Sequence, residues 1–124
     1  MVIMVVGVTP ARDLLVLDVV RRQLDVGDIL PALAGVCRAW RPLAFVGMES
    51  VAFQRLLALE AGRHRDIPPV RELSPQGKGK LARALPAIVK AERGEIHLPR
   101  EAPWLDDFVT ELASFAGADD LADD

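Results

Sequence analysis

The fold predicted from the sequence depends most on one stretch, Leu43-Ala44-Phe45-Val46-Gly47-Met48-Glu49. Its apolar run predicts a buried strand over 43–48, and the helical spacing of apolar residues over 51–61 predicts a helix directly after it. In an open α/β sheet, functional groups lie at the carboxyl ends of the strands. Glu49 stands at such an end, where it carries a function, caps the helix that follows or is simply a solvated side chain.

The rest of the chain supplies the other elements of an α/β fold. Residues 2–9 and 13–21 are rich in Val, Ile and Leu and are separated by a short turn, a pattern that predicts a β-hairpin. We expect a further strand over 69–73 and helices over 27–40, 80–92 and from Pro103 onward. With 124 residues and 51% apolar content, the chain has material for one domain spanning 1–124, a mixed sheet with helices packed on it.

Charge is divided unevenly along the chain. Residues 1–100 hold all 15 Lys and Arg against 10 acids, whereas residues 101–124 hold 8 acids and no base. In a helix Asp119, Asp120 and Asp123 would share one face, where like charges repel. Such a cluster is tolerated either as a solvated C-terminal tail or around a divalent cation such as Mg²⁺ or Mn²⁺.

The basic residues of the body gather between Arg63 and Arg83, and this segment has two interpretations. Lys78, Lys80 and Arg83 suit the phosphate backbone of double-stranded DNA, but a solvated loop explains them equally well. The Gly-Lys pairs do not form a phosphate-binding loop, because no Ser or Thr follows either lysine.

Single residues indicate the compartment and exclude some kinds of site. No apolar run is long enough to cross a bilayer, so we expect no membrane partner. Cys37 lies on a helical apolar stripe and is expected to be a buried thiol in a reducing cytoplasm. His64 and His97 have no ligand-spaced cysteine or acid nearby and are expected to be surface imidazoles rather than zinc ligands.

Several motifs, in this order and spacing, resemble the C-terminal nuclease domain of tailed-phage terminase large subunits. The resemblance covers nearly the whole chain. The matching segments are Val16–Arg21, Val46–Glu49 with Phe53-Gln54, Arg83-Ala84, Glu92–Pro99, Ala102–Phe108 and the Asp119-Asp120-x-x-Asp123 ending.

This resemblance implies a ribonuclease H-like fold and a Mg²⁺- or Mn²⁺-dependent endonuclease that cuts concatemeric DNA by two-metal phosphodiester hydrolysis. By residue, Glu49 resembles the family's second acid, and Asp119, Asp120 and Asp123 resemble its last acidic group. Lys80 and Arg83 match basic positions that could face DNA, and Lys78 lies beside them. The implied partners are double-stranded DNA and other terminase or portal subunits, in the cytoplasm of a bacterial host cell.

The chain also departs from the family pattern. The family's first strand, with its catalytic aspartate, and the preceding ATPase domain have no counterpart in this sequence, and Ala118 precedes the aspartate pair where the family often has histidine. The chain is therefore expected either to be a nuclease domain or to be a non-catalytic prophage remnant or DNA- or protein-interaction module. A third interpretation is an unrelated small α/β domain with an acidic tail.

Overall fold

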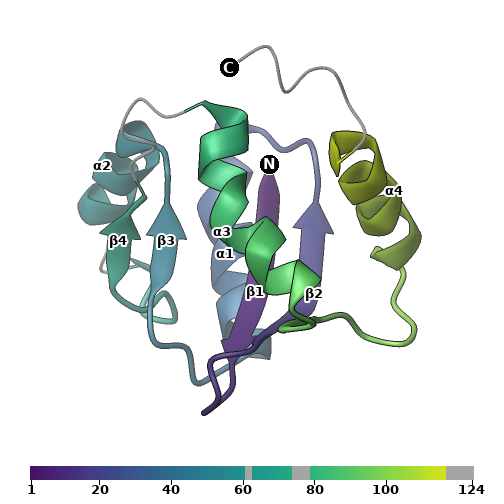
Figure 1. The fold of residues 1–124 in the computed structure, drawn as a ribbon. Coiled ribbons are helices and arrows are strands. Elements are labelled where there is room, and N and C mark those ends of the chain that lie inside the picture. The colour runs from purple at the N-terminus through teal and green to yellow at the C-terminus, as the bar shows by residue number, and fades with distance from the viewer. Residues whose placement is uncertain (61–62, 74–78, 117–124) are drawn as a thin grey trace. The chain divides into compact units, whose positions relative to one another are not determined.

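The computed structural model describes residues 1–60, 63–73 and 79–116, which form five strands and four helices (Figure 1). In chain order these are β1 (Val2–Val8), β2 (Leu14–Arg21), α1 (Val26–Ala39), β3 (Val46–Met48), α2 (Val51–Leu59), β4 (Val70–Glu72), α3 (Lys80–Glu92), β5 (Ile96–His97) and α4 (Leu105–Ala116). The predicted α/β class is confirmed, and the ribonuclease H-like arrangement stays a prediction. None of the described helices has the length and apolar character needed to cross a membrane.

The chain divides into two compact units, which are described separately. The first contains Met1 and residues 22–75, with α1, β3, α2 and β4. The second contains residues 2–21 and the described part of 76–124, with β1, β2, α3, β5 and α4. That 1–124 behaves as a single domain stays a prediction.

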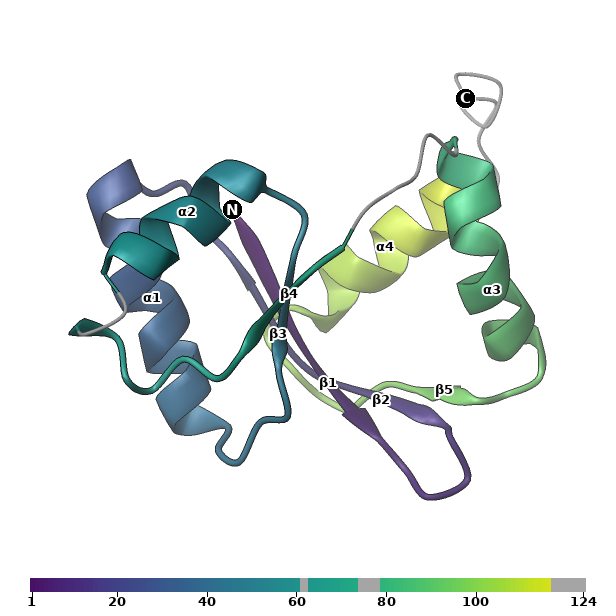
Figure 2. The same cartoon turned by 90° about the vertical axis from the view of Figure 1, so that its left-hand side faces the viewer.

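The second unit is built on the predicted hairpin. β1 and β2 pair antiparallel, from Val2 opposite Arg21 to Val8 opposite Leu14, with an irregularity after Val5 that inserts one extra residue into β2. The short strand β5 adds to the other edge of β2 in parallel, at Leu14 and Leu15. Figure 2 shows α3 and α4 on the same side of this sheet.

The first unit has its core along α1. Its apolar stripe buries Leu30, Leu33, Ala34 and Cys37, and α2 contributes Leu57. Both helices lie on one side of the β3–β4 ladder (Figure 2). The two strands are parallel, with Val46 opposite Val70 and Met48 opposite Glu72.

Two predictions about the sheet are corrected. Among the described residues, the strands pair as two sheets, β1-β2-β5 and β3-β4, and not as one mixed sheet. The predicted buried strand 43–48 is shortened to Val46–Met48, because the ladder begins where the Val46 amide bonds to the Pro69 carbonyl at 2.9 Å.

The apolar run is also less buried than its composition suggests. Phe45 remains 41% exposed, and the Arg71 guanidinium lies 4.2 Å from the centre of its ring. A cation–π contact of this kind lets an aromatic ring stay at the surface. The run therefore lies largely at the surface and does not form a central buried strand.

Candidate functional site

The carboxyl ends of β3 and β4 form the edge where the sequence places a functional acid. Because the strands are parallel, both chains leave the ladder at the same edge, β3 after Met48 and β4 after Glu72. Glu49 follows Met48 directly, and both Glu49 and Glu72 are exposed. A backbone hydrogen bond joins the two chain segments at this edge, because the Leu73 amide donates to the Met48 carbonyl at 2.8 Å.

A glycine allows the two strand ends to pack closely. A Cβ atom added to Gly47 would lie 2.7 Å from Leu73 Cδ1 and 2.9 Å from Leu73 Cγ. Any larger residue at position 47 would therefore have to displace the Leu73 side chain. Gly47 and Leu73 together set the path of the chain just before and just after the edge that carries Glu49 and Glu72.

The structure separates two roles that the sequence left open for Glu49. The N-cap of α2 is Ser50, whose hydroxyl oxygen accepts a hydrogen bond from the Phe53 amide at 3.3 Å. The neighbouring turn is held by Gln54, whose side-chain amide donates to the Met48 carbonyl at 3.4 Å. The interpretation of Glu49 as the cap is therefore wrong. Within the described residues its exposed carboxylate makes no hydrogen bond or ion pair, which fits both a solvated side chain and a functional one.

The described residues do not assemble a complete metal centre. In the ranges 1–60, 63–73 and 79–116, no three His, Cys, Asp or Glu side chains form a group that could hold a metal ion. The predicted ligands Asp119, Asp120 and Asp123 lie outside the described residues. A site shared by Glu49 and these aspartates stays a prediction. Of the four predicted ligands, Glu49 is the one that lies among the described residues.

The predicted DNA-binding residues lie at the start of α3, in the second unit. Lys80 is the first residue of the helix, Arg83 is exposed one turn later, and Lys78 lies outside the described residues. Gly79 is the N-cap, and its carbonyl accepts the Arg83 amide at 3.0 Å. The first turn of α3 contains no acid, so no carboxylate there opposes an approaching phosphate.

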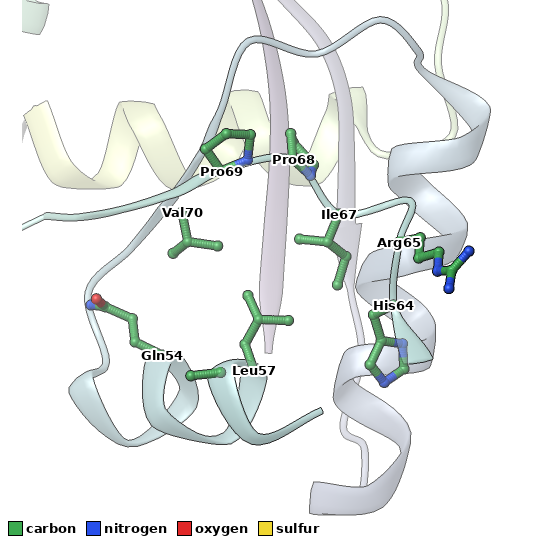
Figure 3. A pocket seen from close by; sticks show the side chains of 9 residues that line it. Gln54, Leu57, His64, Arg65, Ile67, Pro68, Pro69 and Val70 are labelled. Atoms are coloured by element: carbon green, nitrogen blue, oxygen red, sulfur yellow. The ribbon is translucent and has the colours of Figure 1, made fainter. Parts of the chain in front are cut away.

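A hollow of about 400 Å³ lies in the first unit between α2 and the segment 64–70 (Figure 3). Its wall is mainly apolar, with Leu57, Ile67, Pro68, Pro69 and Val70. Two of its polar groups already have partners, since His64 Nε2 lies 3.1 Å from Glu60 Oε2 and the Gln54 amide donates to the backbone, and Arg65 is the third polar side chain in the wall. A mainly apolar pocket in which two of three polar groups are engaged elsewhere is a poor candidate for catalysis.

The sequence analysis missed acidic partners for both histidines. Glu60 stands four residues before His64, an i, i+4 spacing that the sequence itself displays. The His64 side chain is only 12% exposed, so the prediction of a surface imidazole is wrong there. The His97 ring is 49% exposed, and its Nε2 lies 2.8 Å from Asp13 Oδ2, a pairing across 84 residues that no local pattern reveals.

In comparisons with known proteins, no family model, no curated protein and no solved structure matches the chain.

Proposed function

We propose that this chain is a ribonuclease H-like domain of the kind found in terminase large subunits. In this proposal Glu49 is one carboxylate of a divalent-cation site that acts on double-stranded DNA. The observation that carries the proposal is the position of Glu49. It is exposed at the carboxyl end of a parallel strand, and Ser50, not Glu49, is the N-cap of α2.

The residues expected to share the site with Glu49 are Asp119, Asp120 and Asp123. Mg²⁺ and Mn²⁺ prefer carboxylate oxygens, and a bound divalent ion supplies Lewis-acid activation of a phosphodiester and its attacking water. The chain's own contribution would be to fix Glu49 through the Ser50 cap and the Leu73–Met48 hydrogen bond. These two anchors hold the backbone on both sides of the strand end.

Basic residues at the start of α3, of which Arg83 is exposed, support a DNA partner. Lys80 and Arg83, with Lys78 nearby in the sequence, would contact phosphates and not base edges, so binding would depend on salt more than on sequence. Further terminase or portal subunits, and the cytoplasm of a bacterial host, belong to the same proposal.

A second candidate function is a non-catalytic DNA-binding or interaction module of the same ancestry. It is favoured by the number of carboxylates, because two-metal hydrolysis requires several acids from different elements to fix both ions. Here Glu49 is the one predicted ligand that lies among the described residues. Under this second function, the chain binds DNA and cuts it poorly.

Plasmid cleavage distinguishes the two functions. Supercoiled plasmid is incubated with the purified chain and millimolar Mn²⁺, beside a Glu49→Ala, Asp119→Ala, Asp120→Ala variant and a Glu101→Gln control. Little or no cleavage above the triple variant supports the non-catalytic module. Robust cleavage that Glu101→Gln keeps and the triple variant loses would establish the nuclease.

A further inference from the structure

One carboxylate in the first unit holds two arginines. Arg38 lies in the last turn of α1 and Arg41 follows the end of that helix. Both donate to Asp66, which lies between α2 and β4. Arg38 Nη1 is 3.0 Å from Asp66 Oδ2, and Arg41 Nη1 is 3.3 Å from Asp66 Oδ1. Each arginine therefore binds its own oxygen of the same carboxylate, which holds the two guanidiniums close to each other.

The carboxylate does not occupy all the donors of the two arginines. A guanidinium carries five N–H donors in a planar fork, and each bond to Asp66 involves a single Nη1 atom. The side chains of Arg38 and Arg41 are 52% and 63% exposed, and that of Asp66 is 31% exposed. Because two cations share one anion, the group keeps a net positive charge and further donors for a second anion.

Two more arginines lie in the same segment as Asp66. Both are exposed, and with the first two they form what we call the arginine cluster: Arg38, Arg41, Arg63 and Arg65. All four belong to the first unit. Residues 30–45 and 63–69 supply the cluster, and Asp66 is the only acid within these two ranges. The acid that precedes them, Glu60, is already paired with His64. The cluster therefore carries an excess of positive charge.

We propose that the arginine cluster binds the phosphate backbone of double-stranded DNA, with Arg38 and Arg41 contacting phosphate oxygens. This inference rests on the proposed function for its partner, and it adds a DNA contact in the first unit to the one expected at α3. Arginine suits the role because its planar fork can bind two phosphate oxygens at once, whereas lysine acts as a point charge. A neutral or cationic partner would gain nothing from the excess charge.

Asp66 has a positioning role in this arrangement. A free arginine side chain loses conformational entropy when it binds a phosphate. Because Asp66 already holds Arg38 and Arg41, part of that loss has occurred before DNA arrives. The same carboxylate also repels a phosphate. Removal of Asp66 therefore separates the two effects, since charge alone predicts tighter DNA binding and positioning predicts weaker binding.

Fluorescence anisotropy of a labelled duplex over a salt series tests the surface. Arg38→Gln with Arg41→Gln should weaken binding about tenfold at low salt and reduce the slope of log affinity against log salt by about two, one for each lost phosphate contact. Arg38→Lys with Arg41→Lys keeps the charge and should lower affinity without lowering the slope. The matched control, Arg22→Gln with Arg55→Gln, removes the same charge from two exposed arginines of the same unit and should leave the slope nearly unchanged.

Asp66→Ala tests the positioning role. It should weaken DNA binding about threefold or more although it adds one net positive charge, and tighter binding would contradict the role. If the parent binds DNA and the Arg38→Gln, Arg41→Gln variant keeps the slope of the matched control, the inference is overturned and the contact expected at α3 stands. A parent without affinity for DNA would overturn both this inference and the DNA partner of the proposed function.

Discussion

The Leu73 side chain fills the space in which a side chain at Gly47 would begin, with Leu73 Cδ1 2.7 Å from the position of a Cβ there. Gly47 lies opposite Arg71 in the β3–β4 ladder, and Leu73 follows directly after Glu72, the last residue of β4. This contact ties the local geometry of the candidate site to one glycine and one leucine.

Gly47→Val should therefore lower the free energy of unfolding by about 1 kcal/mol or more, because it overpacks against Leu73. Leu73 is 47% exposed and can be shortened at little cost, so Leu73→Ala in the same chain should recover most of that loss. Urea denaturation of the parent, the two single variants and the double variant measures the coupling. Additive effects would show that the two side chains do not compete for the same space.

Ser50 fixes the start of α2 beside Glu49. Ser50→Ala removes the acceptor of the Phe53 amide and should cost about 1 kcal/mol of stability, whereas Ser50→Asp keeps an acceptor and should cost much less. Glu49→Gln should leave the denaturation midpoint nearly unchanged, since Glu49 is not the cap. If Glu49→Gln lowered stability as much as Ser50→Ala does, Glu49 would have a structural role at the start of α2.

Cys37 is 1% exposed, and burial, reinforced by the negative charge of Asp66, raises the pKa of its thiol. A folded-state pKa above the ordinary value favours the neutral thiol, so its contribution to stability is complete below the unfolded-state pKa, near 9.0, and declines above it. We expect the native chain to react slowly with a thiol reagent at neutral pH and rapidly after denaturation. Cys37→Ser should weaken the alkaline loss of stability. Rapid labelling of the native chain would contradict the burial.

Arg83 should contribute to DNA affinity through phosphate contact. Arg83→Ala is expected to weaken binding to unrelated DNA sequences equally and to reduce the slope of log affinity against log salt by about one. Arg100→Ala, which removes another exposed arginine of the same unit, serves as the control. Fluorescence anisotropy over a salt series measures both slopes. If the slope of log affinity against log salt were the same for Arg83→Ala and Arg100→Ala, the DNA would not contact Arg83.

Local patterns in the sequence predicted most elements of the fold. The hairpin, the helices α1, α2 and α3 and the strand at 70–72 depend on periodicity and turn residues, which are visible in short windows. The late helix begins at Leu105, two residues after the expected Pro103, because Pro103 and Trp104 form a turn. Boundaries of this kind depend on the last hydrogen bond and not on composition.

Pairing between distant segments was harder to predict. The pairing of β3 with β4, the pairing of β2 with β5 and the His97–Asp13 pair depend on contacts between residues far apart in the chain. The exposure of Phe45 depends on its contact with Arg71, which is 26 residues away, so the contact cannot be predicted from the apolar run alone. Glu49 was correctly placed at a strand end, but only the structure could assign the cap to Ser50.

Manganese binding followed by electron paramagnetic resonance tests the proposed carboxylate site most directly. The free Mn²⁺ signal falls as the ion binds, so the titration reports affinity without requiring cleavage. We expect the Glu49→Gln variant and the Asp119→Asn, Asp120→Asn double variant each to weaken Mn²⁺ binding about tenfold or more. When all three substitutions are combined, the loss of binding free energy should be smaller than the sum of the two separate losses, because the three residues would hold the same ion. The Glu101→Gln control should bind like the parent. Unchanged affinity in Glu49→Gln, with binding lost only in the aspartate variant, would show that Glu49 is not part of a metal site.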